Sequence, residues 1–332
     1  MKERLLQYLI CPACHAERLT LHAQARDAAE VREGEVICAS CGASMAIHNG
    51  ILNTLVNPRD VVVTEAQGWV QMLEVPEKRH EFTDEWILAL PFVRADQTPD
   101  PAAAHAWNQV GKHFYENLDR VDWRGKRVLE IGAGRCWGVA ELARRGADVV
   151  GLDIVARKYI GLESADVLLA AGAPFFERVL GDMLNLAFRA GAFDYVLTSS
   201  SLHHTHALLP ALTEIARVLA PEGRAFFINE PVIVDDAPRP DTSDWAETRH
   251  SIVELRPTVS EWKAAFSEAG LGILDVRIDD DMHILLWKGA SQGYFPQDDP
   301  HGPHRGLRRY RAVREIEHRL WTTYDRVKAW LR

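Results

Sequence analysis

The stretch that decides the fold is Val128-Leu-Glu-Ile-Gly-Ala-Gly-Arg-Cys-Trp-Gly138. A short apolar run leads directly into a glycine-rich loop, which predicts a buried strand, a tight turn and the start of a helix. Gly132 and Gly134 let the backbone approach a bound ligand where any Cβ would collide. Such a turn alone also suits a dinucleotide. Glu130 favours a different ligand, because a carboxylate repels a pyrophosphate but attracts an ammonium or sulfonium group.

Strand-like and helix-like segments alternate on the carboxyl side of this stretch, which is typical of an α/β fold with a mostly parallel sheet. We expect seven strands, at residues 127–131, 148–153, 175–180, 194–198, 224–230, 271–278 and 283–287. Helices fit residues 138–145, 159–171, 207–219 and 260–269, and a further helix is expected at about 102–118.

Polar residues stand at the ends of several predicted strands. Asp153 ends the second strand, where a carboxylate can accept both ribose hydroxyls of an adenosine. Asp182 follows the third strand, at a place where an adenine amino group could donate to it. The fourth strand leads into residues 199–204, and the fifth ends at Glu230. Ligands of open α/β sheets bind beyond the carboxyl ends of the strands, so these positions predict one shared site.

Together these motifs resemble the class I S-adenosylmethionine-dependent methyltransferases over roughly residues 105–290. The resemblance is carried by E-I-G-A-G (130–134), G-L-D-I (151–154), G-D-M (181–183), residues 193–204 and R-V-L-A-P-E-G-R (217–224). It implies a seven-stranded Rossmann-like methyltransferase sheet and S-adenosylmethionine as the cofactor. The glycine loop would lie under the methionine part, Asp153 would hold the ribose and Asp182 the adenine. The expected cofactor-binding residues are Glu130, Gly132, Ala133, Gly134, Asp153, Ile154, Asp182, Met183, Ser199 and Tyr115.

Two features of this region leave alternatives open. Arg135-Cys136-Trp137 is bulky where the family often has small residues, so it could narrow the methionine pocket or face the helix interior. Tyr115 could cover the cofactor, or it could pack with its neighbours on an amphipathic lid helix.

Three residues are candidates for catalysis: His203, His204 and Glu230. One histidine could orient the acceptor or act as a general base. Alternatively, one caps the following helix and the other packs beside adenine. Glu230, fixed in direction by Pro231, could contact the substrate or act as a base, or it could only form a salt bridge. The expected reaction is direct in-line displacement at the sulfonium methyl group.

Four of the five cysteines follow the pattern C-x2-C-x23-C-x2-C, at Cys11, Cys14, Cys38 and Cys41. Two such pairs can close a tetrahedral zinc site, and four thiolates leave no open position, so the predicted metal is structural. This part of the chain is similar to zinc-ribbon domains related to the tRNA-methyltransferase activator subunit. The fifth cysteine, Cys136, is interpreted as a small hydrophobic residue.

The chain of 332 residues is expected to have four parts. They are a zinc ribbon (1–56), a helical linker region (57–104), the methyltransferase domain (105–290) with a substrate-side insertion (232–258), and a C-terminal extension (291–332). Residues 301–332 hold nine Lys and Arg and three Asp and Glu, a local charge of +6 within a chain of −9. Their apolar spacing predicts an amphipathic helix that packs on the protein or forms a homodimer. Its arginines could instead contact RNA, an anionic membrane or an acidic partner.

Composition limits the function further. No run approaches the ~18–20 apolar residues of a membrane span, and no secretion signal is evident, so we expect a cytoplasmic protein. The first hypothesis is a small-molecule methyltransferase with a structural zinc ribbon. The second is an rRNA or tRNA base methyltransferase whose ribbon presents RNA, which is disfavoured because residues 1–60 show no basic cluster interleaved with aromatics. The third is a non-catalytic partner that binds S-adenosylmethionine or a protein.

Overall fold

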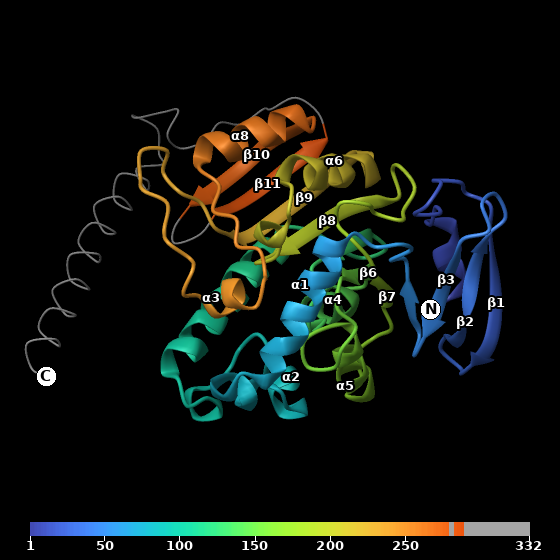
Figure 1. Cartoon of the computed structure of the whole chain (residues 1–332), viewed down its shortest axis with the longest axis horizontal. Coiled ribbons are helices and arrows are strands. Elements are labelled where there is room, and N and C mark those ends of the chain that lie inside the picture. Colours follow the sequence, from blue (N-terminus) through green and yellow to red (C-terminus); the bar gives the residue numbers. More distant parts are fainter. Residues whose placement is uncertain (279–281, 289–332) are drawn as a thin grey trace, which may run out of the picture.

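The computed structural model describes residues 1–278 and 282–288, and Figure 1 shows them built around a single twisted sheet. The sheet has eleven strands in the order β1-β2-β3-β4-β7-β6-β5-β8-β9-β11-β10. Their bounds are β1 Leu19–Arg26, β2 Val31–Cys38, β3 Ser44–His48, β4 Ile51–Asn53, β5 Arg127–Ile131, β6 Asp148–Asp153, β7 Glu177–Leu180, β8 Phe193–Ser199, β9 Leu219–Glu230, β10 Leu271–Ile278 and β11 Met282–Lys288.

Eight α-helices lie within the described residues. They are α1 Asp60–Gln71, α2 Asp84–Ala89, α3 Pro101–Leu118, α4 Trp137–Arg144, α5 Ala165–Ala170, α6 Leu208–Val218, α7 Ala246–Arg249 and α8 Val259–Glu268. Two short 3-10 helices, η3 (Pro76–Glu81) and η6 (Leu202–His204), border the site described below. None of the helices in the two described ranges is both long enough and apolar enough to cross a membrane.

The predicted strand before the glycine loop is β5, and it lies in the middle of the parallel part of the sheet. Its apolar residues Val128, Leu129 and Ile131 are completely buried, as expected for a parallel strand covered on both faces. The strands that follow it in the chain lie on opposite sides, with β6 and β7 on one side and β8 and β9 on the other. The strand order therefore reverses between β5 and β8, where α/β proteins place their ligand sites.

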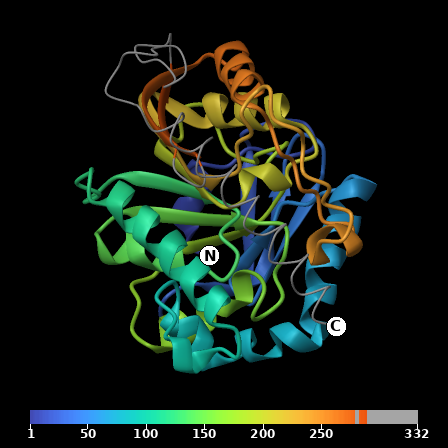
Figure 2. The same cartoon turned by 90° about the vertical axis from the view of Figure 1, so that its left-hand side faces the viewer.

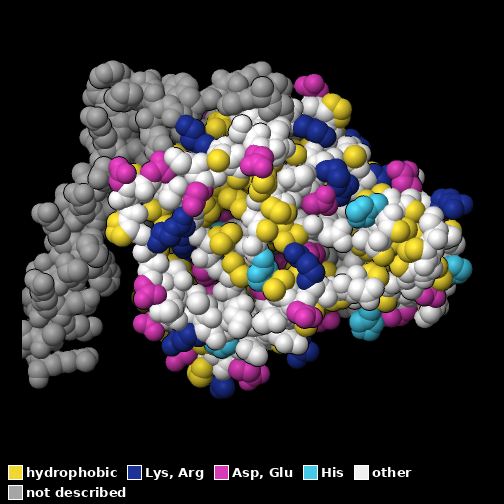
Figure 3. Space-filling model, turned by 45° about the horizontal axis from the view of Figure 1, so that its top comes forward, with side chains coloured by type: hydrophobic (Ala, Val, Ile, Leu, Met, Phe, Trp, Pro, Cys, Tyr) yellow, Lys and Arg dark blue, Asp and Glu magenta, His cyan; other side chains and the backbone are white. Residues whose placement is uncertain are grey.

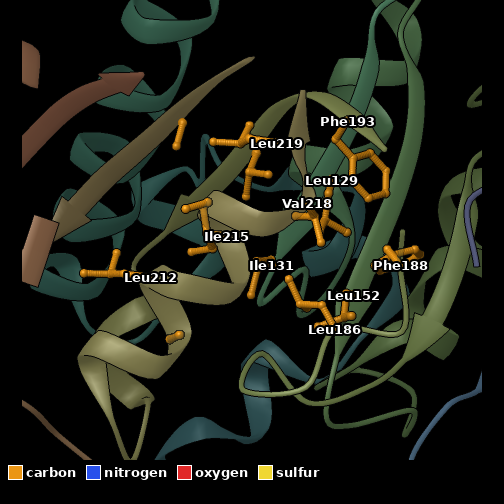
Figure 4. Close-up of a cluster of buried hydrophobic side chains, with 14 of the residues drawn as sticks. Leu129, Ile131, Leu152, Leu186, Phe188, Phe193, Leu212, Ile215, Val218 and Leu219 are labelled. Atoms are coloured by element: carbon orange, nitrogen blue, oxygen red, sulfur yellow. The ribbon is translucent and has the colours of Figure 1, made fainter. Parts of the chain in front are cut away.

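Helices cover both faces of the sheet. Helices α6 and α8 share one apolar core with it, and α3, α4 and α5 share a second core on the other face. Figure 4 shows the first core, where side chains from β5, β6 and β8 meet Leu212, Ile215 and Val218 of α6. These two cores fix the carboxyl ends of the central strands, and with them the position of the glycine loop.

The expectation of a seven-stranded sheet is wrong in its count. All seven predicted segments form strands, β5 to β11, but the sheet continues through the four strands of the N-terminal region. Strand β4 pairs in parallel with β7, and Ile51 lies opposite Arg178. Leu5, Val36 and Leu52 belong to the same apolar core as Leu129. The N-terminal strands β1 to β4, called the ribbon below, are therefore not packed as a separate body. A pairing between residues so far apart in the chain has no signature in local sequence.

A buried ion cluster joins the ribbon to the rest of the sheet. The Arg178 side chain is fully buried, pairs with the equally buried Glu30, and places Nη1 3.1 Å from Asp166 Oδ1. Arg32 Nη1 also donates to Glu30 Oε1, at 2.8 Å. Gly50 turns above this cluster with φ +76°, and a Cβ there would collide with both Glu30 and Arg178. The hairpin can close over the ion pair only with glycine at this position.

The predicted C-terminal helical extension at 291–332, and the homodimer suggested through it, lie outside the described residues.

We expect Arg178→Met to lower the free energy of unfolding by about 2 kcal/mol or more, because it removes the fully buried partner of Glu30 and leaves this carboxylate with only the Met1 amino group and Arg32. Urea denaturation of the purified protein measures this change. Arg124→Met is the matched control, because Arg124 pairs with Asp122 at the surface, where 81% of its side chain is exposed; it should cost less than about 1 kcal/mol. Equal effects of the two substitutions would show that the buried cluster does not hold the ribbon.

Candidate cofactor-binding site

A cavity of about 410 Å³ lies at the carboxyl ends of the central strands. Nine of the ten predicted cofactor-binding residues line it: Glu130, Gly132, Ala133, Gly134, Asp153, Ile154, Asp182, Met183 and Ser199. Helices α1 and α3 and the turn η3 supply further lining residues from the N-terminal side of the chain. The structure thus brings these nine residues together around one cavity, whereas the strand-end residue Glu230 lies outside it.

The glycine loop is held tightly between its neighbours. The backbone N–H groups of Gly132 and Ala133 both donate to the Leu152 carbonyl, at 2.8 and 3.0 Å. Gly132 has φ +72°, and a Cβ on it would lie 2.3 Å from Ser201 Cβ. Glycine is therefore required by conformation and by space, and the backbone of the loop forms one wall of the cavity.

Glu130 is a buried polar side chain of this wall. It is 4% exposed, and its Oε2 has no hydrogen-bond partner among the residues that the structure describes. A Cβ on Gly138 would approach its Oε1 to 2.4 Å, so the carboxylate lies directly against the start of α4. Burial, with a smaller contribution from Asp153, raises the pKa of Glu130 to about 8. A carboxylate held in this way favours a ligand that brings a positive charge.

Two further carboxylates stand beside the loop. Asp153 accepts hydrogen bonds from the backbone N–H groups of Gly134 and Val155, at 2.7 and 2.8 Å, and burial raises its pKa to about 6 despite these bonds. Asp182 accepts from the Leu184 N–H at 2.8 Å and pairs with Arg59 at 2.6 Å. Both acids line the cavity with oxygens that can accept more than one donor.

Glu230 and His203 are not among the cavity lining, in contrast to their predicted contact with substrate. Glu230 is completely buried, and its oxygens accept from Thr198 Oγ1 and from the backbone N–H groups of residues 201–203, at 3.0–3.2 Å. Its Oε2 lies 2.9 Å from His203 Nδ1. Burial alone would raise the pKa of Glu230, but His203 and the N–H groups lower it. The pair therefore fixes the turn that carries the neighbouring histidine.

His204 is the catalytic candidate that does line the cavity. Its Nδ1 lies 2.7 Å from the Val253 carbonyl, which can only accept, so Nδ1 carries the proton and Nε2 keeps a free electron pair. Burial, together with neighbouring His203, lowers the pKa of His204 well below 6.5. The edge of Trp69 packs against the ring, with centroids 5.1 Å apart. The imidazole is thus a neutral, oriented acceptor of a proton.

Tyr115, the tenth predicted cofactor residue, does not reach the cavity. Its ring packs against Phe92 and Phe114, with centroids 5.3 and 6.2 Å away, and the Arg145 guanidinium lies 5.4 Å from it. Helix α3 lines the cavity with Trp107 and Val110 instead. Tyr115 follows Val110 by five residues, which corresponds to a rotation of about 140° beyond a full turn. Its side chain therefore lies on another side of the same helix.

Several of the lining residues that sequence reasoning missed come from the region expected to be a linker. Val62, Glu65, Trp69, Met72, Glu81 and Phe82 all line the cavity. The departure noted in the glycine loop is explained here: Arg135 Nη2 lies 3.0 Å from Glu81 Oε2, and its Nε donates to the Tyr159 carbonyl at 2.7 Å. The spacing of residues 62, 65, 69 and 72 by three or four positions is the sequence feature that could have indicated one face of a helix here.

The predicted substrate-side insertion contributes as well. Glu247, in α7, lines the cavity and pairs with Lys78 at 3.1 Å. The loop between α7 and α8 supplies the Val253 carbonyl that orients His204. In the same loop, the backbone N–H of Leu255 donates to the His203 carbonyl at 2.8 Å.

The four cysteines of the ribbon form a second, separate cluster. Cys11 Sγ lies 3.6 Å from Cys41 Sγ, Cys14 Sγ lies 3.6 Å from Cys38 Sγ, and all four sulfurs lie within 4.8 Å of one another. A tetrahedron with Zn–S bonds of ~2.3 Å has edges of about 3.8 Å, so the spacing fits a zinc ion. After the second cysteine of each pair, His15 and Gly42 turn with φ +58° and +77°. Two equivalent turns therefore point four thiols at one point.

Comparisons with known proteins find matches to the part of the chain that contains the glycine loop and the strand-end acids of the cavity. Residues 129–227 match the family described as "Methyltransferase domain". The chain is 31% identical over 150 residues to a demethylmenaquinone methyltransferase of Corynebacterium glutamicum, covering 40% of this chain and 61% of that protein. It is 34% identical over 134 residues to a fatty-acid O-methyltransferase of Mycolicibacterium smegmatis, covering 40% of this chain and 45% of that protein.

These matches do not extend over whole proteins, since the chain spans about half to three fifths of the curated relatives named here. Among solved structures, a putative methyltransferase from Bacillus halodurans is similar with a TM-score of 0.44 and 16% identity, over 54% of this chain and all of that one. The segment that matches the methyltransferase family, residues 129–227, includes the glycine loop, Asp153, Asp182 and both histidines.

We expect His204 to remain neutral, with its proton on Nδ1, at pH 6.5 and above, because burial disfavours the charged ring and the Val253 carbonyl holds the tautomer. Long-range ¹H–¹⁵N NMR correlation spectra distinguish the two tautomers and the charged form. The signal that is missing from the spectrum of His204→Gln is assigned to His204. Protonation of this ring near pH 6.5, or a proton on Nε2, would contradict the assigned orientation.

Proposed function

We propose that this protein is an S-adenosylmethionine-dependent methyltransferase that acts on a small molecule. The observation that carries the proposal is Glu130, a buried carboxylate with an unpartnered oxygen beside the glycine loop. S-adenosylmethionine brings an ammonium and a sulfonium, and either would offset the cost of burying this acid. Asp153 and Asp182 would take the ribose hydroxyls and the adenine amino group, which are donors.

The lining of the cavity supports a largely apolar small molecule as the acceptor. It includes the apolar side chains of Phe82, Trp107, Trp137, Val110 and Met72. The relatives named above carry quinone-precursor and fatty-acid methyltransferase names, which is consistent with such an acceptor. In Figure 3, acidic and basic side chains are interspersed over the face shown, which does not favour a polyanionic substrate there.

The bound cofactor would supply the electrophilic methyl group. The chain's own residues would align the acceptor with it and exclude water, which accounts for most of the rate gain in a displacement of this kind. His204 Nε2 would accept the proton that an acceptor hydroxyl or amine loses as its oxygen or nitrogen bonds to the methyl carbon. Glu230 and Val253 would act only as positioning groups, through His203 and His204.

We further propose that Cys11, Cys14, Cys38 and Cys41 hold a structural zinc ion. The sulfur spacing described above supports a closed tetrahedral site, and such a site has no open position for a substrate. The metal would stabilise the ribbon turns at the edge of the sheet, away from the cavity.

Isothermal titration calorimetry with S-adenosylhomocysteine tests the proposed cofactor. We expect binding at a 1:1 ratio, and an increase of about 10-fold or more in Kd for Asp153→Ala, which removes the acceptor for two hydroxyl groups. Asp122→Asn, at an exposed surface pair, should bind like the unmodified protein. The thermal unfolding midpoint of each sample identifies a misfolded variant. A well-folded protein that binds no S-adenosylhomocysteine would exclude the proposed function.

For the ribbon, elemental analysis of the purified protein should find about one zinc per chain. Cys38→Ser should lose the metal and lower the unfolding midpoint, because the thiolates would be left close together without an ion. Cys136→Ala provides the control, since this buried cysteine lies in the glycine loop, and its zinc content should be unchanged. Stoichiometric zinc retained by Cys38→Ser would overturn the assignment.

A further inference from the structure

The inner face of α1 lines the cavity instead of packing on the apolar core. Val62, Glu65, Trp69 and Met72 follow one another at spacings of three, four and three residues, and all four are lining residues. Val61, Val63 and Val70, which point elsewhere, are 38–42% exposed. Figure 1 shows this helix in front of the carboxyl ends of the central strands. Helix α1 therefore closes the cavity with a single stripe of side chains.

Contacts on both sides hold the helix in this place. A Cβ on Gly68 would lie 1.9 Å from the His250 carbonyl oxygen, so the helix backbone lies directly against the insertion. Figure 2 shows the same neighbourhood from the side, with α1 next to the α7 segment. From the sheet side, His206 Nε2 lies 2.8 Å from Glu65 Oε2. The position of Glu65 is thus fixed from two directions.

Glu65 carries an unusual carboxylate for a helix that covers a cavity. The residue is 3% exposed, and within residues 1–278 and 282–288 its Oε1 has no hydrogen-bond partner. Burial raises the pKa of Glu65 to about 8, and the charges of Asp153 and Asp182 add to the rise. These two acids are the predicted ribose and adenine contacts. A ligand that enters among three carboxyl groups must bring hydrogen-bond donors, and an anionic group is excluded.

We propose that Glu65 is a cofactor-binding residue that holds the adenosine part of S-adenosylmethionine from the side of α1. The inference rests on the proposed function and adds to it a contact from outside the matched methyltransferase segment of residues 129–227. Asp153 and Asp182 belong to the sheet, whereas Glu65 belongs to a helix that precedes the domain in the chain. Cofactor recognition is therefore shared between the α/β domain and the N-terminal helices.

Calorimetry with two ligands tests this assignment. S-adenosylhomocysteine contains the adenosine and the amino-acid part, whereas 5′-methylthioadenosine has the same adenosine part with only a methylthio group in place of the amino-acid part. Glu65→Gln should raise the Kd for both ligands by a similar factor, about 10-fold, because it exchanges an acceptor for a donor near their shared part. Glu74→Gln is the matched control, since Glu74 is exposed just beyond the same helix, and it should leave both Kd values unchanged.

Two other outcomes for Glu65→Gln overturn the proposal. If only S-adenosylhomocysteine binds more weakly, Glu65 faces the amino-acid part; if neither ligand is affected, it does not contact the cofactor. Failure of the unmodified protein to bind either ligand would instead refute the proposed function itself. Should Glu65→Gln lower the unfolding midpoint, Glu65→Asp, which keeps the carboxyl group on a shorter side chain, is measured in its place and should weaken both ligands alike.

Discussion

The burial of carboxyl groups around one cavity is the constraint on which the rest of the site depends. Glu130 and Asp153 form no salt bridge with Lys or Arg among the described residues, and burial raises the pKa of each. Removing such groups from water is costly unless a partner returns the lost interactions. A ligand with a positive charge, hydroxyl groups and an amine has the complementary chemistry. The glycine loop, the strand-end turns and helix α1 all serve to keep these acids close together.

The architecture explains how so much polar burial is tolerated. The cavity lies at the strand-order reversal between β5 and β8, where two apolar cores brace the sheet from both faces. The N-terminal ribbon adds strands to the same sheet and shares the first of these cores. The Arg178–Glu30 pair lies at the junction, so ribbon and α/β domain share a single packed interior. A metal cluster at the outer edge would therefore support the sheet as a whole.

Local sequence predicted what depends on near neighbours in the chain. The apolar runs located β5 to β11, and the glycine loop with Asp153 identified the cavity, because strand ends and turns carry their own residue signatures. Contacts between distant segments were not predictable in the same way. The pairing of β4 with β7 and the approach of Glu65 to Asp153 depend on tertiary packing. Glu230 was assigned to the site from its strand end, whereas its direction, into the turn at 201–203, is set by the backbone N–H groups it accepts from.

A crystal structure of the protein with S-adenosylhomocysteine is the most direct test of the central claim, that the buried carboxyl groups form a cofactor site. The account predicts the ribose at Asp153, the amino group of the amino-acid part close to Glu130, and the adenosine within hydrogen-bond reach of Glu65. A complex in which the ligand lies outside this cavity, or leaves Glu130 and Glu65 without new partners, would contradict it.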